Sequence, residues 1–186
     1  NGACGATGHG FAIVTHPTWL ADFDHCTIAQ LREWTGYAGL EIFNGSIIGD
    51  PGSPYAVDKW DMLLNAGRRL WGYANDDTHR PQDVGVGWNV ALVKERSPAG
   101  VVAALRAGCF YCSTGVIIHS IQVEGLHIRI ETANARRIKA VQDAGQVWAW
   151  ADDRVLEVDV SAKARYARLE CWGTGEQVAW SQPFFV

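Results

Sequence analysis

Long apolar runs, a strong net charge and a high density of cysteines are all missing from this chain of 186 residues. No window approaches 18 consecutive apolar residues, which excludes a membrane-spanning helix. Charged residues make up 19% of the chain and the net charge is −4, so a surface for general nucleic-acid binding is not expected. Hydrophobic residues nonetheless make up 48%, which indicates a folded protein rather than a disordered one.

The five cysteines are too few and too irregularly spaced for a disulfide scaffold. Cys109 and Cys112 form a C-x-x-C pair, but no second pair follows, so we interpret them as ordinary small apolar residues. A reducing compartment, most simply the cytoplasm, is the expected location. The first ten residues contain no Met, no basic segment and no apolar segment, so they do not form a signal peptide and do not resemble a natural start.

The first part of the chain alternates between short apolar segments and segments with helical spacing. We expect strands over residues 11–15, 39–43, 70–74 and 90–93, and helices over residues 27–34, 56–66 and 98–107. Gly67 follows the second helix as a C-cap glycine, and Ser97 precedes Pro98 as an N-cap of the third. Such alternation predicts an α/β fold built on a parallel sheet or barrel.

The helical patterns end near residue 109, and six strands are predicted beyond it. They cover residues 116–123, 126–132, 138–142, 146–151, 155–160 and 166–171. Strands at this spacing predict a small antiparallel, sandwich-like domain. We therefore divide the chain into residues 1–115, the α/β part, and residues 116–186, the β-rich part.

Polar side chains follow three of the predicted strands directly. His16 follows the first, Asn44 follows the second, and the third leads into Asn-Asp-Asp-Thr-His-Arg at residues 75–80. Functional groups of α/β proteins gather at the carboxyl ends of strands. Because zinc, manganese and iron accept mixed His and Asp ligands, His16, Asp77 and His79 are candidate ligands of a divalent metal ion.

Several segments also carry a resemblance to a known family. They are residues 11–17 (FAIVTHP), 40–45 (LEIFNG), 61–67 (DMLLNAG) and 72–79 (GYANDDTH). Their order resembles the later part of a PHP (polymerase and histidinol phosphatase) domain. Residues 104–115 are similar to a segment that follows in PHP-type phosphoesterases, and residues 165–170 and 178–183 resemble the β-rich tail of a metallohydrolase subgroup.

The resemblance implies part of a distorted (β/α)7 barrel that hydrolyses phosphoesters with metal-activated water. It makes His16, Asp77 and His79 metal ligands, with Asp77 and His79 catalytic. Glu41 and Asn44 match an E-x-x-N segment that shapes the floor of the pocket, where Asn44 faces substrate. Asp76 is expected to lie beside the metal ligands, and Arg80 is the best candidate to bind the phosphate of a phosphorylated small molecule or nucleotide.

One family motif is missing, since none of the six histidines forms the H-x-H expected near the start. We therefore expect a fragment that has lost most metal ligands and is inactive alone, or else a degenerate, non-catalytic relative. A partial barrel would leave a sheet edge exposed, which predicts self-association.

Two other functions stay open. One is metal-dependent hydrolysis of an amide or other C–N bond on a related barrel. The other is a non-catalytic binding module, because Trp148, Trp150, Trp172 and Trp180 could stack on sugars.

Overall fold

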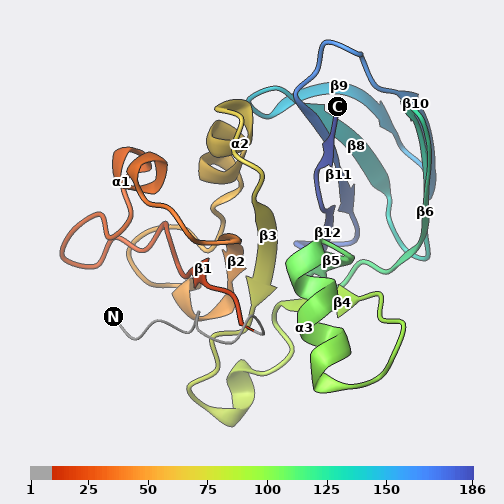
Figure 1. Ribbon diagram of the computed structural model, residues 1–186. Coiled ribbons are helices and arrows are strands. Elements are labelled where there is room, and N and C mark those ends of the chain that lie inside the picture. Colours follow the sequence, from red (N-terminus) through yellow and green to blue (C-terminus); the bar gives the residue numbers. More distant parts are fainter. Residues whose placement is uncertain (1–9) are drawn as a thin grey trace.

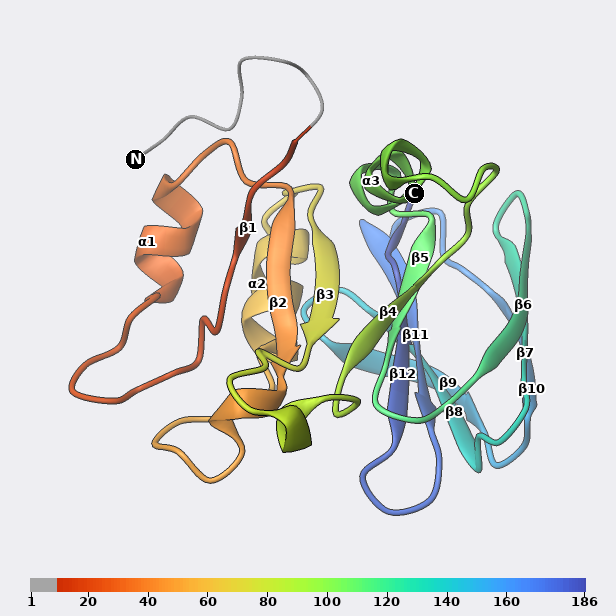
Figure 2. The ribbon, with the colours of Figure 1, turned by 90° about the horizontal axis from the view of Figure 1, so that it is seen from below.

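Three β-sheets stand side by side, with the largest in the middle (Figures 1 and 2). The structure is a computed structural model that describes residues 10–186. One apolar core lies between the parallel sheet and the middle sheet, and includes Trp60, Tyr73 and Trp180. A second core, with Ile130, Ile138 and Leu169, lies between the middle sheet and the third.

The first sheet is parallel and has the order β1-β2-β3. Its strands are β1 (Ile13–Val14), β2 (Gly39–Asn44) and β3 (Trp71–Asn75), and the helices beside it are α1 (Ile28–Glu33) and α2 (Val57–Asn65). All six residues of β2 are buried, as expected for a parallel strand that is covered on both faces. Because the three strands are parallel, their carboxyl ends meet at one edge of the sheet.

The middle sheet has seven strands, and all its strand pairs are antiparallel. It consists of β4 (Trp88–Ala91), β5 (Phe110–Ser113), β8 (Arg137–Gln142), β9 (Gln146–Ala151), β11 (Tyr166–Trp172), β12 (Val178–Ser181) and β13 (Phe184–Phe185). Helix α3 (Pro98–Ala107) connects β4 to β5. Its predicted ends are confirmed, since Ser97 Oγ accepts the Gly100 N–H and Gly108 adopts the left-handed conformation after the last turn.

The third sheet is antiparallel, with the order β10-β7-β6. Its strands are β6 (Ile118–Glu124), β7 (His127–Thr132) and β10 (Val155–Asp159). One face of this sheet carries alternate buried residues, among them Ile128 and Ile130, which fill the second core. The other face is exposed, as the period-2 pattern of these strands predicts.

Two side-chain amides connect the parallel sheet to the middle sheet. Gln182 accepts the N–H of Gly72 at 2.9 Å and donates to its carbonyl at 2.8 Å. Asn89 makes the same two hydrogen bonds with Ala74, at 3.1 and 2.8 Å. Gly72 and Ala74 direct their backbone groups away from β2, so these amides occupy the edge of β3 that a fourth parallel strand would otherwise pair with.

The expected fold class, a part of a (β/α)7 barrel followed by a sandwich-like domain, is wrong. The described residues form open sheets, with thirteen strands and only three α-helices. The predicted fourth strand, at residues 90–93, occurs as β4 at 88–91 and pairs antiparallel with β5. The parallel sheet therefore ends at β3 instead of curving into a barrel.

Strands from both sides of the predicted boundary at residue 115 share the middle sheet. The division into residues 1–115 and 116–186, like self-association, stays a prediction. Within residues 10–186 no helix is both long enough and apolar enough to span a membrane.

Candidate functional site

Four polar side chains form a hydrogen-bonded cluster where β2 and β3 end, which we call the strand-end network: Glu41, Asn44, Asn75 and Asp77. Its centre is the Glu41 carboxylate, only 3% exposed. This carboxylate accepts hydrogen bonds from the side-chain amides of Asn44 at 2.8 Å and Asn75 at 2.7 Å. It also accepts the backbone N–H of His16, which connects the end of β1 to the same cluster. A buried carboxylate is thus stabilised by three donors.

Asn44 connects the two carboxylates of the network. Its side-chain Nδ2 donates to Glu41 and, at 3.2 Å, to Asp77. Its Oδ1 accepts the backbone N–H groups of Ser46 and Ile47 and so caps the short turn after β2. Asn44 is only 2% exposed, and its expected role at the floor of a substrate pocket stays a prediction.

His16 and Asp77 both have a positive φ, of 33° and 53°. Non-glycine residues rarely adopt this conformation, and it costs energy that the surrounding contacts must offset. Strained residues of this kind gather at functional sites. Here each of the two positions lies two residues after a strand, His16 after β1 and Asp77 after β3, at the network.

His79 lies at the exposed side of the network. Its Nδ1 is 2.6 Å from the backbone carbonyl oxygen of Asp77, and since a carbonyl only accepts, Nδ1 carries the proton. Nε2 is then the unprotonated nitrogen of the neutral ring. The hydroxyl of Ser46 lies 3.5 Å from Nδ1. We call Ser46, His79 and Arg80 the rim.

Asp83, which the sequence interpretation missed, holds the backbone of His79 and Arg80 in the rim. The Asp83 carboxylate accepts the backbone N–H groups of both His79, at 3.1 Å, and Arg80, at 2.8 Å. Asp83 stands three residues after Arg80 and two after Pro81, a spacing typical of a capped turn, which is the signal that could have identified it. Asn75 was missed as well, although it directly follows the strand predicted at residues 70–74 and is the last residue of β3.

Arg80 carries the only cationic side chain of the rim. Its side chain is 71% exposed, and its guanidinium lies 3.6 Å from Asp83. An ion pair this exposed contributes little to stability. The guanidinium can therefore leave Asp83 for a bound anion at small cost.

Asp76 was expected to lie beside the metal ligands, but its carboxylate binds the loop between β3 and β4. Its carboxylate accepts three consecutive backbone N–H groups, from Gly85, Val86 and Gly87, at 2.7–2.9 Å. Partial burial raises the pKa of Asp76, but these three donors lower it further, so the pKa lies below its ordinary value. Asp76 thus closes the loop between β3 and β4.

The imidazole of His16 lies beside Trp19, edge to face, with ring centroids 5.1 Å apart. Its Nδ1 is buried and has no hydrogen-bond partner among the described residues. Only the backbone of His16 joins the network.

The prediction that the chain is metal-binding is contradicted. Across residues 10–186 no group of three or more His, Cys, Asp or Glu side chains could hold a metal ion. The reason is visible in the contacts: Glu41 and Asp77 are engaged by amide donors, and the two imidazoles lie against Trp19 and against a backbone carbonyl. The roles of His16, Asp77 and His79 in a reaction stay predictions.

The four tryptophans of the β-rich part do not form one aromatic surface. Trp180 is buried in the first core, whereas Trp150 is 63% exposed. The pairing of β8 with β9 shifts between Ala140 and Val141, and this bulge leaves Trp148 without a direct partner in the ladder. Trp148 packs against the second core, whereas Trp150, two residues further along β9, is exposed.

Comparison with known proteins finds no matching family model, no matching curated protein and no matching solved structure. The resemblance to the PHP family is therefore not supported by any match. Together with the open, β-rich sheets, this overturns the assignment of the chain to that family.

Proposed function

We propose that the strand-end network and its rim form the active site of a phosphoester hydrolase. The observation that supports this most is the fixed tautomer of His79. Its Nδ1 is held by the Asp77 carbonyl, which leaves Nε2 available at the exposed side of the cluster. A histidine oriented in this way can act as a general base, and an arginine stands next to it in the chain.

The proposed reaction is direct hydrolysis. His79 Nε2 takes a proton from a water molecule while the water oxygen attacks phosphorus. The bond from phosphorus to the leaving oxygen breaks, and the leaving oxygen receives the proton from the His79 imidazolium. Arg80 would bind the non-bridging oxygens through two N–H donors, as guanidinium groups do with phosphates.

Charge supports the rim rather than the network as the place where phosphate binds. Glu41 and Asp77 would repel a phosphate, but Glu41 is buried and its oxygens already accept hydrogen bonds. The exposed groups are His79 and Arg80, which are neutral or cationic. Glu41, Asn44 and Asn75 therefore act as positioning residues that hold the ends of β2 and β3 together beneath the rim.

A panel of chromogenic substrates tests this function on the purified chain. The expectation of an inactive fragment rested on the PHP resemblance, whereas the metal-free reaction proposed here needs only described residues. We therefore expect release of p-nitrophenol from p-nitrophenyl phosphate or bis(p-nitrophenyl) phosphate, and none from a p-nitroanilide. Hydrolysis of the anilide alone would favour the alternative, cleavage of a C–N bond. His119 is exposed on β6, so the His119→Gln variant is a matched control that should retain activity.

A further inference from the structure

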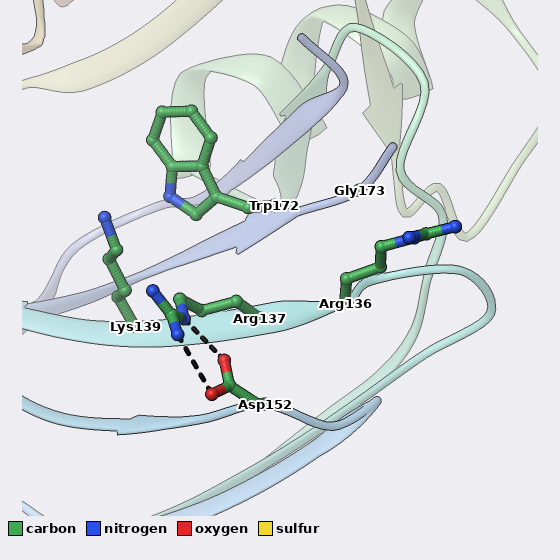
Figure 3. Close-up of a pocket in the computed structure, with 6 residues that line it drawn as sticks. All are labelled: Arg136, Arg137, Lys139, Asp152, Trp172 and Gly173. Atoms are coloured by element: carbon green, nitrogen blue, oxygen red, sulfur yellow. Dashed lines mark hydrogen bonds and ion pairs between the residues drawn. The ribbon is translucent and has the colours of Figure 1, made fainter. Parts of the chain in front are cut away.

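A second candidate site lies on the middle sheet, where β8 runs between β9 and β11. It is an open pocket of about 360 Å³, lined by Arg136, Arg137, Lys139, Asp152, Trp172 and Gly173 (Figure 3). Ile138 and Ala140 face the second core, so Lys139, between them, projects from the opposite face of the sheet. None of the residues that line the pocket belongs to the strand-end network or its rim.

The pocket is lined by three cationic side chains and one carboxylate. That carboxylate, Asp152, is held by Arg137 through two hydrogen bonds, from Nε at 2.5 Å and from Nη2 at 2.9 Å (Figure 3). Within residues 10–186, neither the side chain of Arg136 nor Nζ of Lys139 has a hydrogen-bond or ion-pair partner. The lining thus carries three cationic side chains and one carboxylate, Asp152, and is positively charged overall.

The reason Lys139 lacks a carboxylate lies in the neighbouring strand. Glu170 stands directly opposite Lys139 in the pairing of β11 with β8. However, both carboxylate oxygens of Glu170 accept other hydrogen bonds, one from the buried Arg168 at 2.7 Å and one from Trp172 Nε1 at 3.2 Å.

The same hydrogen bond fixes the Trp172 ring as a platform. With Nε1 held by Glu170, the indole stands upright in the pocket, and Lys139 Nζ lies 4.9 Å from its centroid (Figure 3). A ligand can therefore make two contacts here: a flat ring can stack on the indole, and an anionic group can bind the ammonium.

We propose that this pocket binds a small molecule that carries a phosphate on a ring, with a nucleoside monophosphate as the representative ligand. The phosphate would contact Lys139 and the free N–H groups of Arg137, and the ring would stack on Trp172. Nucleobases stack well on tryptophan, and the volume of the pocket is of the size that binds small ligands. Arg136, at the open side, would add attraction at longer range.

Titration calorimetry with AMP, adenosine, ribose 5-phosphate and inorganic phosphate tests this proposal on the full chain at low salt. We expect AMP to bind at least about tenfold more tightly than either adenosine or inorganic phosphate, because it makes both contacts. Ribose 5-phosphate that binds as well as AMP would identify the sugar as the stacking ring and would also support the site. Inorganic phosphate that binds as tightly as AMP, or AMP that does not bind at millimolar concentration, would overturn the proposal.

Two variants locate the binding. Lys139→Gln and Trp172→Leu should each weaken AMP binding by about tenfold. Lys163→Gln removes the same charge from an exposed loop position outside the pocket and should leave AMP binding unchanged. Lys139 is on the surface of its strand, so its variant remains informative if Trp172→Leu fails to fold. Unchanged affinity in folded Lys139→Gln would contradict the assignment, whatever the hydrolase assays give.

Discussion

Arg168 and Asp61 form a buried, two-point ion pair although 107 residues separate them in the chain. The guanidinium donates from Nε at 2.8 Å and from Nη2 at 2.6 Å, and the two side chains are 1% and 7% exposed. Asp61 lies on α2 and Arg168 on β11, so the pair connects the parallel layer to the middle sheet. Tyr166 completes it by donating its hydroxyl to Asp61 at 2.8 Å.

Breaking this pair should strongly destabilise the fold. Asp61→Ala leaves the buried Arg168 without its main partner, and we expect a loss of about 3–5 kcal/mol in the free energy of unfolding. Urea denaturation measures it. Asp58→Ala, on the exposed side of the same helix, should cost less than about 1 kcal/mol. Equal losses in both variants would show that the ion pair does not connect the layers.

The amide of Gln182 should be needed to cover the free edge of β3. Gln182→Leu leaves the buried N–H and carbonyl of Gly72 without partners, which should cost about 1–3 kcal/mol of stability. Gln146→Leu, at an exposed end of β9, makes the same chemical change and should have little effect in the same denaturation assay. A Gln182→Leu variant as stable as the wild type would contradict the role of this amide.

The loop that Asp76 closes should open in acid. Because the pKa of Asp76 is lowered in the folded state, its contribution to stability is complete above the ordinary value of 3.8 and is lost as the pH falls through the lower, folded value. Amide exchange of Gly85, Val86 and Gly87 should therefore lose protection below about pH 4. In Asp76→Asn this protection should be weaker at neutral pH and should not change over the same range. Full protection of the wild type at pH 2 would contradict the prediction.

Local structure could largely be predicted from the sequence, because it depends on short-range patterns. The caps at Ser97 and Gly67, the helices near residues 28–33 and 57–65, and the six strands predicted between residues 116 and 171 agree with the observed elements. Each follows from apolar spacing or from the conformational preference of a single residue. Strands β12 and β13 were not predicted.

The arrangement of the sheets could not be predicted in this way. Alternation of strands and helices up to residue 108 suggested a parallel barrel, but β4 and β5 pair antiparallel and join strands that come much later. The deciding contacts connect residues far apart, such as Gln182 with Gly72, and carry no local signal. Tertiary pairing therefore overrode the local pattern.

The candidate site was predicted in part. The rule that polar residues gather at the ends of parallel strands placed Asn44 and Asp77 at one sheet edge, where they form a hydrogen bond. Glu41, which binds Asn44, was named only through the resemblance to the PHP family. The roles of these residues stay predictions. The rule did not show that side-chain amides would donate hydrogen bonds to Glu41 and Asp77. The sequence does not reveal which carboxylate oxygen lies opposite which donor. Nor did the rule show that Asp76 turns away to the loop at residues 85–87.

The most direct test of the proposed function is the specificity constant of His79→Gln for the phosphoester that the wild-type chain cleaves best. Glutamine keeps a similar size and a donor for the Asp77 carbonyl, but it cannot accept a proton from water. With the circular dichroism spectrum unchanged, we predict that kcat/KM falls by about 10²–10⁴-fold, the usual contribution of a general base. A folded His79→Gln chain with the kcat/KM of the wild type would contradict the proposal.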